Sequence, residues 1–598
     1  MFDTYRKIMG LLDRRERRQF YALAALSVVM GLVDVVAVMS IVPFLAVVAN
    51  PQIVQSNPEL RFLYTSLGFE GQAGFLAFLG GVVFLIVVFS TAFRAATFYA
   101  LTRFTRMRGL SIATRLLTKY LAQPYPWFLR RHSAQLGRQV LGEVIEVVNG
   151  PIATAMRLMA NLVVVAFLVG LLVAMQPLAA LVAALLVGGC YGLVFLLARR
   201  PLGSLGTVRL EANRQRYQIM QEALGGIKEV KILNLERSYV RRFRDPATRL
   251  AHSQAAMALI AELPRNILEA VAFGGMLLFI VLLLISGGGS LEAVIPVLGA
   301  YAFAGVRLFP TIQQVYAAFA TIRFGSPTLN ALHAELTQPL ADEARDFHGA
   351  PALPMRQRLE LDDVTFAYPG ADRPALDGLT LAIEARTTVG LVGATGAGKS
   401  TAVDVVLGLL QPDGGALRVD GVVVDERNAG AWQKSLGYVP QSIFLTDDTV
   451  AANIAFGVEP QDIDMAAVER AARIAQLHHF VDTLPKGYQE VVGERGARLS
   501  GGQRQRIGIA RALYRDPDVI VFDEATSALD NLTERAVMDA VKALSREKTI
   551  VLVAHRLSTV RHCDAVFLLE DGRLAASGTY DELLDKSTRF RALHEATL

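Results

Sequence analysis

Residues 393–401 read Gly393-Ala-Thr-Gly-Ala-Gly-Lys-Ser-Thr401, and this stretch decides the fold of the C-terminal part of the chain. An apolar run precedes it at 387–392, and a run with helical spacing follows it at 402–410. A strand, a glycine-rich turn and a helix in this order match the phosphate-binding loop GxxxxGK[ST]. Glycines let backbone N–H groups close around phosphates, and the start of the helix adds the positive end of its dipole. The stretch therefore predicts a nucleotide-binding α/β domain.

The residue types in the loop indicate what each of them does. Lys399 is expected to reach the β- and γ-phosphates, and the hydroxyl of Ser400 is expected to bind Mg²⁺. The predicted nucleotide-binding residues of the loop are Gly393, Ala394, Thr395, Gly396, Ala397, Gly398, Lys399, Ser400 and Thr401.

A second apolar run, 518–522, ends in two carboxylates, Asp523 and Glu524. An acid at the end of a parallel strand beside a phosphate loop can hold Mg²⁺ through its water shell, and the next acid can orient or deprotonate an attacking water. A buried acidic pair can also be structural, but beside a phosphate loop the catalytic interpretation is favoured. We therefore predict Asp523 as a metal ligand and Glu524 as the catalytic carboxylate.

The segment Leu499-Ser-Gly-Gly-Gln503 lies shortly before this acidic pair. Together with the phosphate loop, it makes the chain resemble the ATP-binding cassette (ABC) family over essentially its whole length. The resemblance implies Mg²⁺-dependent ATP hydrolysis. By the same resemblance, Gln441 would contact Mg²⁺ and the attacking water, and His555 would contact the γ-phosphate.

In this family each ATP lies between the phosphate loop of one cassette and the signature segment of another, so the resemblance also implies a dimer. The residues it assigns to this site are Ser500, Gly501, Gly502 and Gln503, with Tyr368 stacking on adenine and Asp530 in the loop that couples the two sites. The chain holds one phosphate loop and one signature. A homodimer is the simplest arrangement, and a heterodimer stays open.

The rest of the chain has the composition of a membrane protein. Of its 598 residues, 53% are hydrophobic and 19% charged, which is too apolar for a soluble protein of this size. The net charge of +5 is small and no basic face alternates with aromatic residues, so nucleic acid is not an expected partner. Six stretches are long and apolar enough to cross about 30 Å of hydrocarbon. These predicted spans are 20–49, 74–102, 151–175, 178–198, 266–286 and 291–322.

The connections between the spans differ in charge. Segments 103–148 and 199–263 are rich in Arg and Lys, whereas 50–73 and the two other short connections are nearly uncharged. The positive-inside rule therefore places both termini and the basic segments in the cytoplasm. The basic segments have helical spacing and are expected to extend the spans, and 57–68 is a candidate interfacial helix.

These observations predict a six-helix transmembrane domain over 1–325, a linker over 326–356 and a cassette over 357–598. Fusion of the spans ahead of the cassette resembles the exporter type, with a domain-swapped (type IV) helical bundle joined to an α/β P-loop domain. By that resemblance, surfaces near Tyr125–Gln135 and Leu233–Tyr239 would couple the spans to the cassettes.

Three arginines lie at a similar depth in three predicted spans. Arg94 and Arg307 are roughly 24–30 Å below the outer boundary, and Arg265 begins its span at a similar level. Facing a central cavity, they would form a cationic belt for a phosphate or pyrophosphate head group. Alternatively, such arginines snorkel to the interface or set the topology. Glu269 could neutralise Arg265 one helical turn away, and Asp34 could pair with one of the three.

The sequence around these arginines resembles one ABC subgroup, the flippases of lipid-linked oligosaccharides in bacterial protein N-glycosylation. The contexts are Ala92-Phe-Arg-Ala95, Leu263-Pro-Arg265 and Val306-Arg-Leu-Phe-Pro310. The resemblance implies a bacterial inner-membrane protein that turns a polyprenyl-diphosphate-linked glycan from the inner to the outer leaflet. A general lipid or multidrug exporter is the first alternative, and an ATP-gated channel or regulator is the second.

Overall fold

The computed structural model describes residues 2–50, 52–69, 71–175, 177–286, 291–338, 351–524, 539, 543–554 and 556–595. Inside the helices, most side chains of 175–190 and all side chains of 267–307 lie outside this description. The chain forms two compact units. One comprises Met1–Ala122 and Arg130–Leu340, and the other comprises Gln123–Leu129 and Ala341–Leu598.

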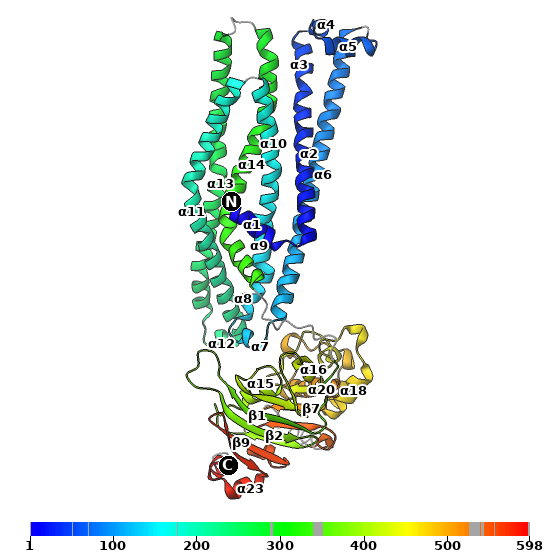
Figure 1. The fold of residues 1–598 in the computed structure, drawn as a ribbon, viewed down its shortest axis with the longest axis vertical. Helices are drawn as coiled ribbons and strands as arrows, with labels where there is room; N and C mark the ends of the chain where they lie inside the picture. Colours follow the sequence, from blue (N-terminus) through cyan, green and yellow to red (C-terminus); the bar gives the residue numbers. More distant parts are fainter. Residues whose placement is uncertain are drawn as a thin grey trace. The chain divides into compact units, whose positions relative to one another are not determined.

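The first unit is helical (Figure 1). Its helices are α1 (Phe2–Leu11), α2 (Arg14–Met39), α3 (Ile41–Ala49), α4 (Ile53–Ser56), α5 (Pro58–Ser66), α6 (Gln72–Leu121), α8 (Ser133–Arg138), α9 (Val144–Val147), α10 (Ala153–Met175), α11 (Pro177–Gly225), α12 (Ile227–Ile232), α13 (Glu236–Ser286) and α14 (Leu291–Thr337). Two π-helical stretches, Gln139–Glu143 and Val148–Ile152, flank α9.

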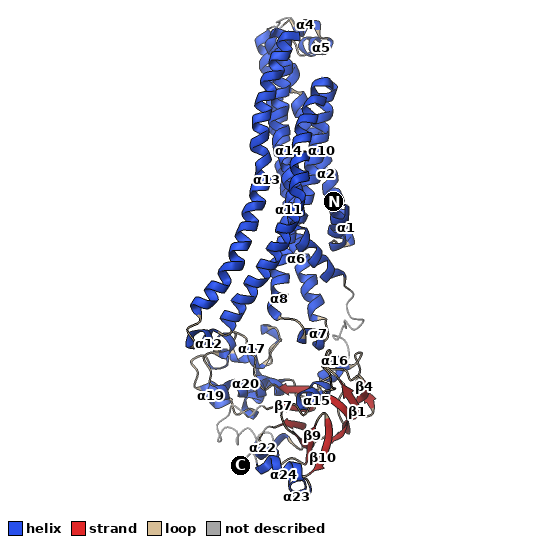
Figure 2. Ribbon diagram, turned by 90° about the vertical axis from the view of Figure 1, so that its left-hand side faces the viewer, coloured by secondary structure: helices blue, strands red, loops and turns tan. Residues whose placement is uncertain are grey.

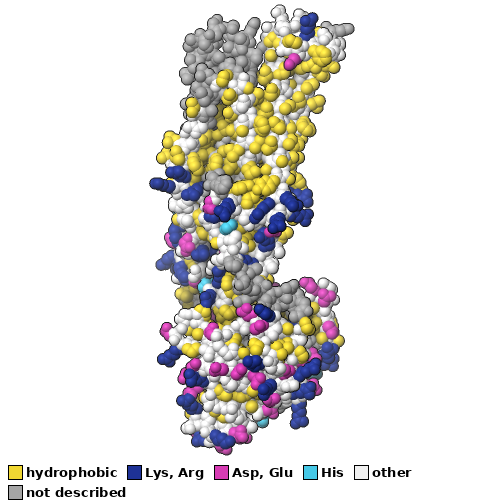
Figure 3. All heavy atoms as spheres, viewed as in Figure 1, with side chains coloured by type: hydrophobic (Ala, Val, Ile, Leu, Met, Phe, Trp, Pro, Cys, Tyr) yellow, Lys and Arg dark blue, Asp and Glu magenta, His cyan; other side chains and the backbone are white. Residues whose placement is uncertain are grey.

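All six predicted spans lie in helices, namely α2 with α3, α6, α10, α11, α13 and α14. Among the described residues, three helical stretches are long and apolar enough to cross a membrane: Arg14–Val48, Gln72–Leu121 and Ala134–Ala174. The side chains of the other three predicted spans fall largely outside the description. On the face drawn in Figure 3, hydrophobic side chains form a band over this unit, and Lys and Arg gather below the band.

The first span is interrupted at Ser40, between α2 and α3. Pro43 has no N–H group, so the carbonyl of Met39 loses its usual helical partner. The backbone N–H of Ser40 still donates to the carbonyl of Val36 at 2.9 Å, and its hydroxyl donates to the carbonyl of Ala37 at 2.8 Å. Beyond α3, Asn57 caps the start of α5 by accepting from two backbone N–H groups, so the predicted interfacial segment 57–68 is indeed helical over Pro58–Ser66.

The predicted helical extensions are confirmed, since α6, α11, α13 and α14 each run for 47–51 residues. Glycine permits close packing of α14 at Gly325, where a Cβ would lie 2.6 Å from Cγ of Pro151. Helix α14 continues to Thr337, so the first part of the predicted linker, 326–337, is helical. The reason is burial, because Leu329 and Leu332 are fully covered by the rest of the unit.

The second unit contains the strands (Figure 2) and helix α7 (Tyr125–Leu129). Its described residues form a four-stranded antiparallel sheet and a six-stranded sheet that is parallel except for β10. The first sheet has the order β2 (Leu376–Glu384), β1 (Arg358–Phe366), β4 (Gly414–Val419), β5 (Val422–Val423). The second has the order β10 (Arg573–Gly578), β9 (Ala565–Glu570), β3 (Thr388–Val392), β8 (Thr549–Val553), β7 (Val519–Asp523), β6 (Leu436–Val439).

Short helices surround these sheets. They are α15 (Lys399–Val406), α16 (Ala429–Gln433), α17 (Val450–Ile454), α18 (Met465–Ile474), α19 (His478–Asp482), α20 (Gly501–Tyr514), α22 (Leu557–Val560), α23 (Tyr580–Lys586) and α24 (Thr588–Glu595). Strands β3 and β8 are buried along their whole length, which explains their uninterrupted apolar sequences. The strand–loop–helix unit predicted around residues 393–401 is confirmed as β3, the loop and α15.

Candidate nucleotide site and membrane arginines

The order of the parallel strands gathers the predicted catalytic segments at one edge of the sheet. Strands β3, β8 and β7 are adjacent and parallel. Their carboxyl ends therefore meet at the edge where open α/β sheets bind their ligands. The phosphate loop follows β3, and Asp523 and Glu524 stand at the end of β7. Strand β8 ends at Val553, two residues before His555 in the sequence.

The phosphate loop needs its glycines for backbone conformation. Gly396 and Gly398 have φ angles of 84° and 96°, in the left-handed region that glycine adopts without strain. Lys399 opens α15, and its Nζ donates to the carbonyls of Gly393 at 2.8 Å and Ala394 at 3.1 Å. Burial lowers the pKa of Lys399, while Glu524 and Asp523 act in the opposite direction. The loop thus holds a buried cation against its own carbonyls, where phosphate oxygens would be stronger acceptors.

The two predicted carboxylates have different partners. Nε2 of Gln441 donates to Oε2 of Glu524 at 2.6 Å, so the structure brings these two predicted catalytic residues together. Glu524 has a φ of 51°, and its N–H donates to the carbonyl of Val553 at 3.1 Å. The hydroxyl of Tyr438 lies 3.4 Å from Oδ2 of Asp523, a weak contact. Burial first, and then Asp523, raise the pKa of Tyr438.

Asp404, on α15, is a further acidic group at this edge, and the sequence analysis missed it. Burial, together with the nearby charge of Asp523, raises the pKa of Asp404 to about 6. The signal was present, since Asp404 is a lone acid within the apolar run 402–410. Tyr438 was missed as well, although it stands three residues before the predicted Gln441.

Tyr368 lies beside the phosphate loop, with its hydroxyl 3.3 Å from Oγ1 of Thr401. Its ring packs edge-on against Phe366, with 5.1 Å between the ring centres. Helix α7 belongs to the same unit, and burial, followed by the charges of Asp404 and Tyr368, raises the pKa of Tyr125. Helix α7 is the first part of the predicted coupling segment Tyr125–Gln135, and this part is included in the ATPase unit. The second predicted coupling segment, near α12, belongs to the helical unit.

The signature segment forms the start of α20. Ser500 caps this helix, because its hydroxyl accepts from the N–H of Gln503 at 3.2 Å and its own N–H donates to Oε1 of Gln503 at 2.8 Å. The backbone of Gly501 and Gly502 forms the first turn, where N–H groups lack helical partners. Ser500 is exposed. Two other predicted residues, Asp530 and His555, lie outside the described residues.

The three membrane arginines have different surroundings. Nη2 of Arg94 donates to Oδ2 of Asp34 at 2.5 Å, so Asp34 does pair with one of them. The Arg94 side chain is 38% exposed and that of Asp34 is 3% exposed. Arg265 is exposed. The side chains of Arg307 and of Glu269 lie outside the described residues.

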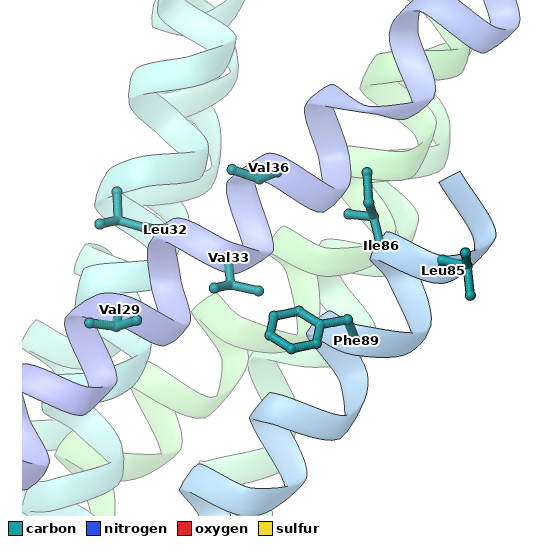
Figure 4. Close-up of a pocket in the computed structure, with 7 residues that line it drawn as sticks. All are labelled: Val29, Leu32, Val33, Val36, Leu85, Ile86 and Phe89. Carbon is teal, nitrogen blue, oxygen red and sulfur yellow. The ribbon is translucent and has the colours of Figure 1, made fainter. Parts of the chain in front are cut away.

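An apolar pocket of about 400 Å³ lies between α2 and α6. Val33 on α2 and Phe89 on α6 face each other across it (Figure 4). Its other lining residues are Val29, Leu32, Val36, Leu85 and Ile86. Two lining residues directly precede polar ones in the sequence, since Val33 is followed by Asp34 and Phe89 by Ser90.

Known proteins match both units of the chain. The sequence profile of the ABC transporter matches residues 376–527, and that of the ABC transporter transmembrane region matches residues 60–302. The ATP-dependent lipid A-core flippase of Cupriavidus metallidurans is 31% identical over 503 residues, which cover 83% of each chain. The chain belongs to the ABC transporter family.

Other relatives and a solved structure agree with this assignment. The lipid A-core flippase of Chromobacterium violaceum is 35% identical over 384 residues, or 64% of each chain. The heterocyst differentiation ATP-binding protein HepA of Nostoc is 29% identical over 519 residues, covering 86% of this transporter and 83% of HepA. A bacterial Atm1-family ABC exporter with ATP bound has a similar fold, with a TM-score of 0.79 over 98% of this transporter and 99% of that chain, at 24% identity.

The predicted fold class is therefore confirmed, with a helical membrane domain joined to a P-loop nucleotide-binding domain. The transporter has the fold of a half-size type IV exporter, and it is an integral, multi-pass membrane protein. Its nucleotide-binding domain binds ATP, and ATP hydrolysis is coupled to transport.

Proposed function

We propose that this ABC transporter is a flippase that moves an anionic lipid, a polyprenyl-diphosphate-linked oligosaccharide, from the inner to the outer leaflet of a bacterial cytoplasmic membrane. The observation that carries the proposal is Arg94, a cation inside a span whose side chain is 38% exposed. A cation at this depth is costly to place in lipid, and ionisable residues inside membrane spans are therefore candidates for a functional role. A guanidinium suits a phosphate because it can donate two parallel hydrogen bonds. Relatives named as lipid A-core flippases support a lipid substrate.

Arg265 and Arg307 complete the proposed site. The first is exposed on α13, and the second belongs to α14, where a count of residues along the span predicts a depth similar to that of Arg94. Three cations at one level would match the two charged phosphates of a diphosphate better than a single cation, because each added charge-assisted hydrogen bond contributes to binding. The cytoplasmic position of both termini follows from the distribution of Arg and Lys between the connections.

The ATP site uses residues that fit Mg²⁺. Ser400, Gln441 and Asp523 offer the oxygen ligands that this ion prefers. No group of three His, Cys, Asp or Glu side chains is gathered as a metal site in the described part of the chain. That is compatible with Mg²⁺, which needs only one or two carboxylates when phosphate and water oxygens complete its shell. When bound, the ion neutralises charge on the β- and γ-phosphates.

Residues of the protein bind the phosphates and activate the attacking water. Lys399 holds the phosphates, and Glu524 orients the attacking water and accepts its proton. Gln441 positions Glu524 through the bond between their side chains. The exposed start of α20 would hold the γ-phosphate of an ATP bound to a second cassette, since backbone N–H groups point from it. We therefore propose a homodimer with two equal sites.

A general lipid or multidrug exporter is the alternative function. The apolar pocket between α2 and α6 favours it, because such a surface binds hydrophobic compounds without requiring a charged head group.

The test compares substrates in nanodiscs that contain the purified dimer. Polyprenyl-diphosphate glycan is expected to stimulate ATP hydrolysis severalfold, whereas neutral polyprenol-linked glycan and cationic drugs are not. In proteoliposomes, changing Arg94, Arg265 and Arg307 each to Ala should slow translocation of the diphosphate lipid. Changing the exposed Arg61, in the external helix α5, to Ala serves as the control. Equal stimulation by neutral lipids or drugs, or full translocation in all three variants, would support the alternative.

A further inference from the structure

A buried polar cluster ties α2 to α6 inside the membrane unit. It consists of Asp34, Ser90 and Arg94. Both oxygens of the Asp34 carboxylate are engaged, because Oδ1 accepts from the Ser90 hydroxyl at 2.7 Å and Oδ2 accepts from Nη2 of Arg94 at 2.5 Å. Asp34 is 3% exposed and Ser90 1% exposed. Ser90 and Arg94 are one helical turn apart, so they lie on the same face of α6.

The side chains of the cluster differ in how much of their surface is exposed. The carboxylate of Asp34 is almost completely covered, whereas the Arg94 side chain is 38% exposed. A guanidinium has five N–H donors in a rigid plane. One edge of this plane is turned to Asp34, and the buried Nε has no hydrogen-bond partner among the described residues. The part of Arg94 that remains exposed is thus held in one orientation by a group that is itself inaccessible.

We propose that Asp34 is a positioning residue for substrate, which holds one edge of the Arg94 guanidinium so that the exposed edge faces a phosphate of the lipid head group. Ser90 supports this role by fixing the second oxygen of the carboxylate. An arginine side chain loses considerable rotamer freedom on binding, and a fixed guanidinium has lost that freedom in advance. The inference rests on the proposed function, because it assigns a role within the same anionic lipid site.

A simpler interpretation of Asp34 predicts the opposite effect on lipid binding when its charge is removed. If Asp34 only neutralises Arg94 in the membrane, it competes with the phosphate for the same cation. Removing the negative charge would then leave Arg94 more attractive to an anionic lipid. If Asp34 positions Arg94, removing the charge frees the guanidinium to move and weakens the binding of the phosphate.

Ser90 separates the two interpretations without changing any charge. Ser90→Ala keeps both Asp34 and Arg94 but removes the bond that fixes the carboxylate. Neutralisation alone predicts no effect of this substitution on lipid binding, whereas positioning predicts weaker binding. Ser90→Thr retains the hydroxyl, so this conservative control should bind the lipid as the wild type does.

The experiment measures ATP hydrolysis in nanodiscs as a function of the concentration of polyprenyl-diphosphate glycan. We expect Asp34→Asn to raise the half-stimulating concentration by about 10-fold, the scale of one lost charge-assisted hydrogen bond. Ser90→Ala should raise it by about 3-fold, and Ser90→Thr should leave it near the wild-type value. The maximal rate and the rate without lipid should change little, since the cluster contains none of the ATP-site residues. Stimulation by neutral polyprenol-linked glycan should be equally weak in every variant.

The outcomes show separately whether the positioning role of Asp34 is wrong or the proposed flippase function is wrong. If the wild type is not stimulated by the diphosphate lipid, the proposed function is wrong and the inference falls with it. If the wild type is stimulated but Asp34→Asn binds the lipid more tightly, Asp34 masks Arg94 and the inference alone is wrong. The same holds if Ser90→Ala, showing wild-type basal hydrolysis, has an unchanged half-stimulating concentration. This second variant decides the question even if Asp34→Asn does not fold.

Discussion

The side-chain amide of Gln441 donates a 2.6 Å hydrogen bond to the carboxylate of Glu524. The two residues follow neighbouring parallel strands, β6 and β7, and so reach the same edge of the sheet from different parts of the sequence. In a hydrolytic site, one group must hold the attacking water while another receives its proton. The direct contact places both groups within reach of one water molecule, next to the phosphate loop.

Replacing Glu524 with Gln should stop turnover while ATP still binds. The amide keeps the shape of the side chain but cannot accept a proton from water, a loss that typically costs 10²- to 10⁴-fold in rate. We expect steady-state ATP hydrolysis to fall by about 10²-fold or more, with nucleotide affinity within about threefold of the wild type. Release of phosphate and binding of a fluorescent ATP analogue measure the two quantities. The exposed Glu547, changed to Gln, is the matched control, and undiminished hydrolysis in the Glu524 variant would contradict its role.

A homodimer with composite ATP sites predicts rescue between two inactive chains. Lys399→Ala should destroy the phosphate loop, and Ser500→Arg should block the signature that faces the other chain's ATP. When the two variants are co-expressed with different tags and purified together, one site of each mixed dimer contains an intact loop and an intact signature. Hydrolysis should then return to a measurable fraction of the wild-type rate. If every site were built within a single chain, the mixed dimers would be as inactive as each parent.

Asp404 predicts an unusual dependence of stability on pH. Its pKa in the folded protein is raised from 3.8 to about 6 by burial and by Asp523, so the fold binds its proton more tightly than the unfolded chain does. Stability should therefore fall as the pH rises from about 4 to 6, and the penalty is complete above that window. Asp404→Asn removes the penalty and should raise the thermal midpoint of the full-length protein at pH 7.5, by the equivalent of about 1–2 kcal/mol. Near pH 4 the variant and the wild type should unfold alike.

Asp420 provides a control, because its pKa is shifted in the opposite direction to that of Asp404. Burial acts to raise its pKa, but hydrogen bonds from the N–H groups of Arg356, Arg358 and Gln357 outweigh burial and lower it. Its contribution to stability is present at neutral pH and is lost as the pH falls toward the lowered pKa. Asp420→Asn should thus lower the midpoint at pH 7.5. Measurements with EDTA and without nucleotide keep ligand binding from contributing to either result.

The start of α2 is held by a carboxylate with two functions that can be separated. Oε2 of Glu16 accepts from the N–H of Asp13 at 2.9 Å in a capping box, and Oε1 pairs with Arg108 on α6 at 2.5 Å. Glu16→Gln keeps a cap acceptor but leaves the nearly buried Arg108 unpaired, at a cost of about 3 kcal/mol. The thermal midpoint in detergent should fall by several degrees. The exposed pair of Lys7 with Asp3 should matter little, so Asp3→Asn is the comparison.

Local sequence patterns predicted the parts of the structure that depend on local physics. The phosphate loop is recognisable because few sequences other than Gly393–Thr401 satisfy the turn and the helix start together. The spans are recognisable from length and hydropathy alone. Side-chain partners far apart in the sequence were harder to predict. Asp34 and Arg94 were expected to pair only as one possibility, because 60 residues separate them and their contact depends on how α2 packs on α6.

Tertiary packing also overrode local signals. The sequence predicted a linker over 326–356. Helix α14 nevertheless continues to Thr337, since burial of Leu329 and Leu332 stabilises the extra turns. Asp404 escaped notice for a related reason, because the approach of Asp523 is a property of adjacent segments in the folded unit.

Helix α7 has a consequence for how this protein can be divided. Residues Gln123–Leu129 are folded into the ATPase unit, although the chain before and after them belongs to the helical unit. A gene fragment beginning at residue 357 would encode both sheets but would lack this inserted piece. The surface around Tyr368 and Asp404, near which Tyr125 lies, would then be bare. A soluble ATPase that retains the whole unit would have to combine two separate stretches of the chain, Gln123–Leu129 and Ala341–Leu598.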